Sequence, residues 1–165
     1  MQDALRALNR LVADGVIGDY AIGGAIGASF YVDALQTEDV DAFVFLPGLT
    51  EGLALLTPVY EALVGLGGVV EREYVRFGEW PLQILTDATP LIAEAIREAE
   101  ETEFEGVPTR VFQAEHLCAI ALQTGRAKDY LRVSMFLEQD AVDGEKLAEV
   151  LQRYGLMDRL ARVQS

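Results

Sequence analysis

The chain has 165 residues, of which 51% are hydrophobic and 24% are charged, and its formal net charge is −14. This is enough to bury one core without disulfides, and because the single Cys118 has no partner and neither a signal peptide nor a membrane-length apolar stretch is evident, we expect a cytoplasmic protein that does not bind a membrane. The acidic balance disfavours a free-standing nucleic-acid binder, which needs a basic surface to neutralise phosphates.

The first part of the chain alternates predicted helices with predicted strands. Leu5, Leu8 and Leu11 recur at helical spacing, which indicates an amphipathic helix. The segment Val40–Leu46 is rich in β-branched and aromatic residues and therefore favours a strand. In chain order, the pattern predicts a helix over 2–13, a strand over 20–23, a helix over 25–35, a strand over 40–46 and a helix over 53–66.

The middle of the chain predicts a β-hairpin. Residues 69–77 alternate along one strand, Gly78-Glu79 forms the turn, and residues 80–85 form the second strand. A helix over 88–101 follows, with an acidic far end that we expect to be a solvated face. Residues 107–112 predict a final edge strand, where Pro108 is tolerated.

Everything after Gln113 predicts helices, over 114–124, 126–139 and 144–154 and from Met157 onward, with a break at Gly125. The whole pattern predicts an α/β (α+β) fold, in which a mixed β-sheet flanked by helices over 1–112 carries a C-terminal helical part over 113–165. No linker separates the two parts, so we expect a single compact unit.

Two aspartates on the strand at 40–46 are the candidate site. Period-two alternation puts Asp39 and Asp41 on one face, where two carboxylates can bind a divalent cation such as Mg²⁺. The preceding Gly23-Gly24 pair lets the backbone approach the phosphates of a nucleotide where a helix begins. The alternative for the aspartates is a solvated strand end.

The charge distribution is consistent with this location. Residues 1–105 hold five basic and nineteen acidic side chains, whereas residues 106–165 hold eight of each. The acidic excess therefore lies entirely in the part that contains the aspartates, and a nucleotide bound through a metal remains compatible with it.

The order of these motifs resembles the nucleotidyltransferase-fold superfamily, and within it the AbiEii-type toxins and the minimal nucleotidyltransferases. The resemblance runs from about Tyr20 to Leu137: a Gly-Gly pair, a helix, Thr37-x-Asp39-x-Asp41, a long helix, a hairpin, a helix with Glu115-His116-Leu117, and then Gly125-Arg126-Ala127-Lys128-Asp129.

The resemblance implies a role for each matching residue. Gly23, Gly24 and Thr37 would bind the nucleotide, Asp39 and Asp41 would be the catalytic metal ligands, and Lys128 would meet a phosphate. The alternative for Lys128 is a local ion-pair cluster with Arg126, Asp129 and Arg132 that docks the helical tail.

The chain departs from the family pattern at two positions. Members commonly carry a third carboxylate on the later strand, where this chain has Gln83, and a lysine in the helix before Gly-Arg, where it has Ala121. Glutamine cannot accept a proton from an attacking hydroxyl. Glu71 or Glu73 on the neighbouring strand is an alternative source of the missing oxygen.

The implied function is Mg²⁺-dependent transfer of a nucleoside monophosphate from a nucleoside triphosphate to a hydroxyl acceptor, a protein or an RNA. The alternatives are a catalytically impaired enzyme and a non-enzymatic interaction or toxin–antitoxin regulatory module with a protein partner. His116 and Cys118 are expected to have structural roles.

Overall fold

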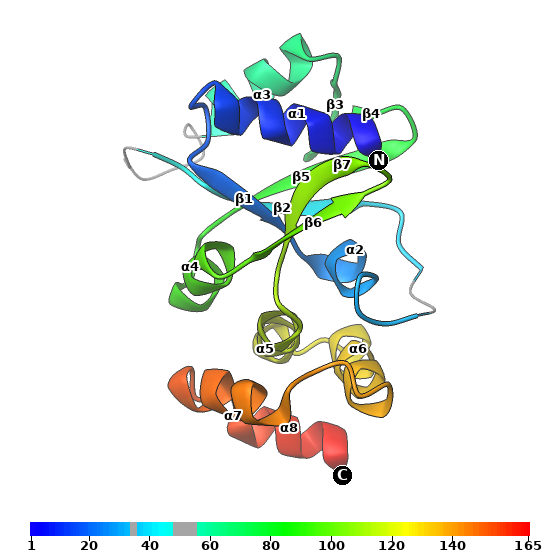
Figure 1. Ribbon diagram of the computed structural model, residues 1–165, viewed down its shortest axis with the longest axis vertical. Coiled ribbons are helices and arrows are strands. Elements are labelled where there is room, and N and C mark those ends of the chain that lie inside the picture. The colour runs from blue at the N-terminus through cyan, green and yellow to red at the C-terminus, as the bar shows by residue number, and fades with distance from the viewer. Residues whose placement is uncertain (34–35, 48–55) are drawn as a thin grey trace.

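In the part of the chain that the structure describes, seven strands form one mixed sheet in the order β3-β4-β5-β2-β1-β7-β6 (Figure 1). The computed structural model describes residues 1–33, 36–47 and 56–165. Strand β2 runs parallel to β5 and β1 parallel to β7, and the other neighbours are antiparallel. The strands are β1 (Asp19–Ile22), β2 (Val40–Phe45), β3 (Val69–Glu71), β4 (Tyr74–Phe77), β5 (Trp80–Thr86), β6 (Glu100–Phe104) and β7 (Val107–Val111). The predicted mixed sheet is confirmed.

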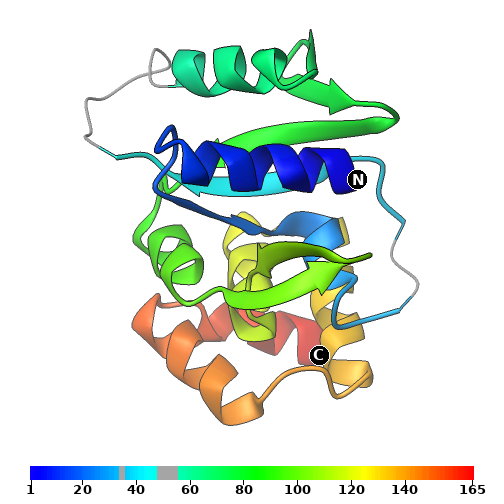
Figure 2. The ribbon, with the colours of Figure 1, turned by 45° about the horizontal axis from the view of Figure 1, so that its top comes forward.

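Helices cover both faces of this sheet (Figures 1 and 2). Helices α1 and α3 lie on one face, and α2, α4 and the C-terminal helices lie on the other. The helices are α1 (Gln2–Ala13), α2 (Gly24–Ala28), α3 (Thr57–Gly65), α4 (Pro90–Arg97), α5 (Ala114–Thr124), α6 (Ala127–Glu138), α7 (Gly144–Arg153) and α8 (Met157–Gln164). In the described part of the chain, none of these helices has the length and apolarity that crossing a bilayer requires.

Strand β2 divides its side chains between the two cores. Val40 and Val44 belong to the apolar cluster under α1 and α3, whereas Phe43 belongs to the cluster on the opposite face. Alternation along the strand therefore turns Asp41, like Phe43, toward the face that carries the C-terminal helices.

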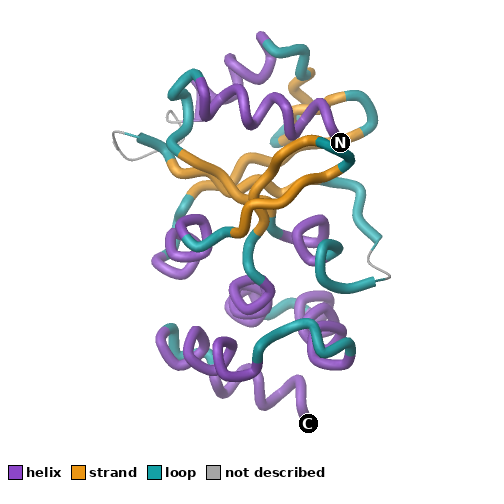
Figure 3. The backbone as a smooth tube through the Cα atoms, in the orientation of Figure 1, coloured by secondary structure: helices purple, strands orange, loops and turns teal. Residues whose placement is uncertain are grey.

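The C-terminal helices share their core with the sheet. Buried residues of α5, such as Leu117 and Leu122, belong to the same apolar cluster as Phe43 and Phe112. Helix α5 lies nearest the sheet, and α6, α7 and α8 pack beyond it (Figure 3). The predicted helices over 114–124, 126–139 and 144–154 and after Met157 agree with α5 to α8 to within one residue at each end.

Two strand predictions and one helix prediction need correction. The predicted strand over 69–77 is two strands, because residues 72 and 73 form a two-residue turn in which Arg72 has φ +59°. The acidic end of the predicted helix over 88–101 is instead strand β6, and α4 ends at Arg97. The strand over 107–111 is not at the edge of the sheet, because β6 pairs outside it.

Two-residue turns explain these differences. Phe104 and Val107 are register partners, and Glu105 and Gly106 between them both have positive φ, +47° and +80°, which suits a tight hairpin turn. Pro108 is tolerated inside the sheet because β1 pairs with β7 only at Val111. The carbonyl of Pro108 instead accepts a hydrogen bond from Asn9 of α1 at 2.7 Å.

Two helix predictions also differ. The helix predicted over 25–35 is the five-residue α2, which ends at Ala28; residues 34 and 35 lie outside the described part of the chain. Gly27 lies in this short helix, where its low helix propensity weakens the segment. The helix predicted over 53–66 begins at Thr57 in the described residues, and residues 53–55 lie outside them.

Candidate active site

Asp41 lies at the junction of three strands and a helix start. Its backbone carbonyl accepts a hydrogen bond from Gly23 at 2.9 Å, at the end of β1, and its register partner on β5 is Gln83. Gln83 is in turn the partner of Tyr74 on β4. Because register partners share a face, the row Tyr74, Gln83, Asp41 lines the side of the sheet that faces α2 and α6.

The Gly23-Gly24 pair has two separate steric reasons to be glycine. A Cβ on Gly23 would come within 2.9 Å of the rings of Phe43 and Phe112, which pack with centroids 4.9 Å apart. A Cβ on Gly24 would lie 2.0 Å from Oδ2 of Asp41, and Gly24 has φ +57°. Gly24 therefore leaves the space that one oxygen of the Asp41 carboxylate fills.

The Thr37 hydroxyl holds Asp39. It lies 3.1 Å from the Asp39 backbone carbonyl and 3.2 Å from Oδ1 of its carboxylate. The pKa of Tyr74 is raised by desolvation and then by the negative charge of Asp39. Thr37 therefore fixes the direction of the first carboxylate, and Tyr74 is sensitive to its charge.

The two carboxylates act on each other. Burial, and then the negative charge of Asp39, raise the pKa of Asp41 to about 6. Arg132, Lys128 and Arg126 on and just before α6 oppose this shift. A half-buried pair of like charges that disfavours full ionisation gains stability when a cation binds between its oxygens.

The residues present fit a divalent cation. Asp39 and Asp41 offer carboxylate oxygens, Gln83 offers one amide oxygen beside them, and the absence of a side chain at Gly24 keeps the approach to Asp41 open. Mg²⁺ usually completes its coordination with water and substrate phosphates. Two carboxylates are therefore enough to hold the ion when a nucleotide supplies further oxygens.

The start of α6 brings positive charge to the same face. Asp129 is buried and accepts hydrogen bonds from the backbone N–H of Arg126 at 3.2 Å and from its Nε at 2.7 Å. Asp129 at the third helical position thus bonds back to the N-cap backbone N–H, as the second half of a capping box does, and fixes the first turn of the helix. Lys128, in that first turn, is exposed, and Arg132 is largely buried.

Comparison with solved structures gives the fold of this site. The chain is similar to the antibiotic-resistance factor ANT(2'')-Ia in solution, at 17% identity and TM-score 0.54 over 99% of this chain and 95% of that one. It is similar to ANT(2'')-Ia in a crystal complex with adenylyl-2''-tobramycin, at 17% identity and TM-score 0.56 over 93% and 98%. It is also similar to an antigenic nucleotidyltransferase-like protein from Paracoccidioides brasiliensis, at 14% identity and TM-score 0.57 over 98% and 90%.

The chain has a nucleotidyltransferase-like fold. No family model and no curated protein matches its sequence. At identities this low, the likeness carries the fold alone, and the roles of individual residues rest on their geometry in this chain.

The contacts described above place five of the six predicted site residues close together: Gly23, Gly24, Thr37, Asp39 and Asp41. The sixth, Lys128, comes from α6 and acts on Asp41 through its charge. Sequence reasoning missed the contribution of Tyr74, because only the register of β4 against β5 places it on the row of Asp41.

Glu71 and Glu73 do not supply a third oxygen. Glu71 lies on β3, three strands from β2, which is about 14 Å at the usual strand spacing. Its carboxylate pairs with Arg76. Among the described residues, no group of three acidic, cysteine or histidine ligands includes Asp39 and Asp41.

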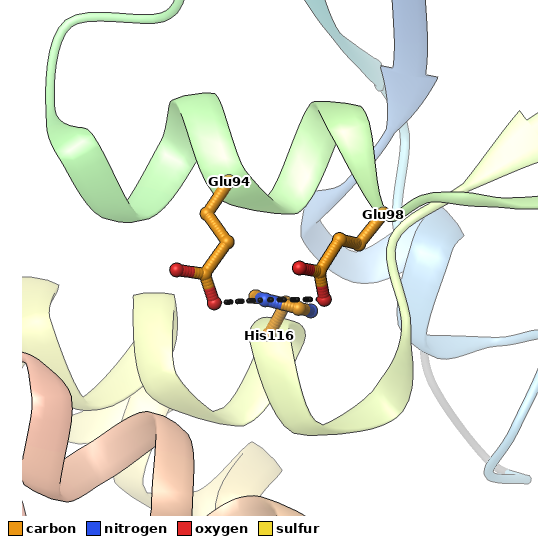
Figure 4. A group of neighbouring side chains, drawn as sticks. All are labelled: Glu94, Glu98 and His116. Atoms are coloured by element: carbon orange, nitrogen blue, oxygen red, sulfur yellow. Dashed lines mark hydrogen bonds and ion pairs between the residues drawn. The ribbon is translucent and has the colours of Figure 1, made fainter.

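A second acidic cluster joins α4 to α5 and α7. Glu94, Glu98 and His116 place one ligand atom each within 4.8 Å of one another, so the cluster could hold a metal ion (Figure 4). Glu94, however, is already well satisfied: it accepts from His116 at 3.0 Å and from the Tyr154 hydroxyl at 2.5 Å, and it pairs with Arg153. These bonds outweigh burial and lower the pKa of Glu94 to about 2.

A cation between Glu94 and His116 would compete with Arg153. The arrangement therefore suits a network that joins three helices better than a metal centre. This network was not predictable from the sequence pattern, because Glu94 and His116 lie on different helices and only packing brings them together.

Proposed function

We propose that the chain is a metal-dependent nucleotidyltransferase that transfers a nucleoside monophosphate from a nucleoside triphosphate to a hydroxyl acceptor. The observation that carries this proposal is the pair of mutually repelling carboxylates, Asp39 and Asp41, held on one face beside Gly24 in a nucleotidyltransferase-like fold. Asp39 and Asp41 would hold Mg²⁺, which supplies charge stabilisation at the reacting phosphate when bound.

The chain's own residues would position the reactants. Thr37 orients Asp39, and the backbone at Gly23 and Gly24 offers a close approach for the triphosphate. The acceptor oxygen attacks the α-phosphorus and pyrophosphate leaves. Gln83 cannot take the hydroxyl proton, so we expect the proton to pass to water and turnover to be slow.

The acceptor belongs to a broad class. The similar protein ANT(2'')-Ia was crystallised with adenylyl-2''-tobramycin, a nucleotidylated small molecule. A hydroxyl on a protein, an RNA or a small molecule is therefore compatible with the fold, and the AbiEii-type branch would favour a macromolecular acceptor.

Titration calorimetry tests the proposal. Wild type with Mg²⁺ is titrated with ATP, CTP, GTP and UTP in turn, and we expect binding of at least one nucleotide to be lost in Asp41→Ala. Asp158→Ala, an exposed aspartate on α8, is the matched control and should bind as the wild type does. Nucleotide binding that is absent, or that Asp41→Ala leaves unchanged, would refute the proposed site.

A non-enzymatic protein-binding or toxin–antitoxin regulatory module is the second candidate, and an exposed apolar surface favours it. Val64, Leu66, Val69 and Val70 are 43–58% exposed beside the edge strand β3. A cavity of about 560 Å³ in the same region is lined by residues such as Tyr60 and Val70. Under this alternative, Val70→Glu would abolish binding to a protein partner, whereas Asp41→Ala would not.

A further inference from the structure

Arg132 of α6 is a largely buried cation with few hydrogen-bond or ion-pair partners among the described residues. Its side chain is only 16% exposed, and its one ion-pair partner among the described residues is Asp129, with 3.8 Å between Nη1 and Oδ1. Its Nε is buried and has no hydrogen-bond partner within the described part of the chain. An unsatisfied buried N–H group is costly, so a ligand that accepts from it would stabilise the site.

Asp129 does not satisfy Arg132, because Arg126 already occupies it. Arg126 donates from its backbone N–H and from Nε to Oδ2, and from Nη2 to Oδ1 at 3.2 Å. The contact of Asp129 with Arg132 is longer than any of these. The guanidinium of Arg132 is therefore available to another anion.

The positive charge of Arg132 lowers the pKa of Asp41. Of the three cations near Asp41, Arg132 lowers the pKa of that carboxyl most, ahead of Lys128 and Arg126. It also opposes the rise in the pKa of Cys118 on α5. Helix α6 lies beside α2 on the side of the sheet that Asp41 faces (Figure 1), and Val133, next to Arg132, belongs to the same apolar cluster as Phe43. Lys128 of the same helix is exposed.

A bound triphosphate would need such a group. Two carboxylates roughly balance one divalent ion, which leaves most of the charge of a triphosphate to be met by other cations. A guanidinium presents a planar fork of donors that matches two phosphate oxygens. The protein supplies this fork on the same face as Asp41, and within the described part of the chain its Nε has no hydrogen-bond partner and its Nη1 has only the 3.8 Å contact with Asp129.

We propose that Arg132 is the phosphate-binding cation of the aspartate site and contacts the triphosphate of the nucleotide directly. This assignment rests on the proposed function, and it places the dominant phosphate contact on Arg132, with exposed Lys128 secondary. The positive charge of Arg132 would also stand in for the lysine that the family resemblance leads us to expect at the position of Ala121 on α5.

Inorganic tripolyphosphate with Mg²⁺ is the probe, because it tests the phosphate contact without a base. We expect Arg132→Met to weaken its binding about 10- to 100-fold by calorimetry, the usual range for hydrogen bonds between charged groups. Arg132→Lys, which keeps the charge but loses the fork, should bind with intermediate affinity. Lys128→Met, which removes the secondary contact, should weaken binding no more than about three-fold. Lys146→Met, at an exposed lysine of α7 outside the site, is the matched control and should bind as the wild type does.

Thermal unfolding separates this role from a structural one. Methionine keeps the apolar stem and removes an unsatisfied donor, so Arg132→Met should melt no lower than the wild type. Arg126→Met, which removes the main partner of buried Asp129, should melt lower. A large loss of stability in Arg132→Met would overturn the assignment.

The calorimetric outcomes distinguish the two proposals. If Asp41→Ala abolishes tripolyphosphate binding and Arg132→Met binds within two-fold of the wild type, the assignment of Arg132 is wrong and the proposed function stands. If the wild type binds neither tripolyphosphate nor any nucleoside triphosphate, both are wrong.

Discussion

Gln83 lies directly beside Asp41, as its register partner across the parallel pair of β2 and β5, with both side chains on the same face of the sheet. The amide therefore stands where a third carboxylate would share a cation with Asp39 and Asp41. Gln83→Asp should tighten Mn²⁺ or Mg²⁺ binding about ten-fold, because it exchanges a neutral oxygen for a charged one.

Calorimetry with Mn²⁺ measures this effect, and pyrophosphate release measures turnover, which we expect to rise because the new carboxylate can accept the hydroxyl proton. Gln152→Asp, on the exposed surface of α7, adds the same charge away from the site and should change neither quantity. An unchanged metal affinity in Gln83→Asp would mean that the cation does not bind at this row.

Gly24→Ala should abolish Asp41-dependent nucleotide binding and lower the free energy of unfolding by about 1–3 kcal/mol. The new methyl group would lie 2.0 Å from Oδ2 of Asp41 and must displace the carboxylate. Gly15→Ala is the matched control, since Gly15 also has positive φ, +71°, but has open space around it. Equal effects of the two substitutions would show that backbone strain alone is responsible.

Asp41→Asn should raise stability at neutral pH in the absence of a divalent cation. The folded protein holds the Asp41 proton up to about pH 6, whereas the unfolded chain releases it near pH 3.8. The folded state therefore loses stability relative to the unfolded state as the pH rises from about 4 to 6, and the loss is complete above pH 6.

The asparagine variant escapes this loss. We expect its advantage over the wild type to be absent below pH 4 and on the order of 1–3 kcal/mol above pH 6. Urea unfolding at pH 4, 5, 6 and 7 with EDTA present measures it. Equal stability of the two proteins at every pH would contradict the buried position of Asp41.

Glu94→Ala should lower the free energy of unfolding by about 3 kcal/mol at pH 7, the usual cost of removing one partner from a buried charged pair. Glu94 accepts from His116 and Tyr154 and pairs with Arg153, so its loss loosens the contacts of α4 with α5 and α7. Glu98→Ala is the matched control, because that side chain is 52% exposed and lies 3.9 Å from His116.

The pH dependence of Glu94 has the opposite sign to that of Asp41. Its pKa is lowered from 4.5 to about 2, so its contribution is present above pH 4.5 and is lost as the pH falls through 2. A difference between wild type and Glu94→Ala that shrinks over this acid range would support the network. If added Zn²⁺ raises the stability of the wild type but not that of Glu94→Ala, the cluster is instead a metal centre.

Apolar periodicity was sufficient to predict most helices and the strands nearest the site. The spacing of Leu5, Leu8 and Leu11 predicted α1, and the apolar run around Asp41 predicted β2. Both elements bury a continuous face, so local pattern and tertiary packing favour the same structure.

Tight turns without a glycine at their start limited the prediction elsewhere. Arg72 adopts φ +59°, a conformation that its residue type does not suggest, so the division of β3 from β4 was missed. In the same way, β6 carries an acidic sequence typical of a helix surface, and only its pairing with β7 makes it a strand.

The candidate site was predictable in part. The spacing of Asp39 and Asp41 alone indicated that they share a face, whereas the neighbours Gln83 and Tyr74 follow from the register between strands far apart in sequence. The burial of Arg132 depends on how α6 packs, which a helical pattern does not determine.

The aspartates lie in the N-terminal part of the chain, and the cations that oppose them lie in its C-terminal part. On the ribosome, β2 emerges long before α6, so the nascent chain carries Asp39 and Asp41 without Arg132 and presents Phe43 and Phe112 without their helical cover. The arrival of α5 and α6 therefore brings cations to the aspartates and covers the apolar face that carries Phe43 and Phe112. A chain released before α6 would retain its acidic half but have no positive charge at the site with which to hold a nucleotide.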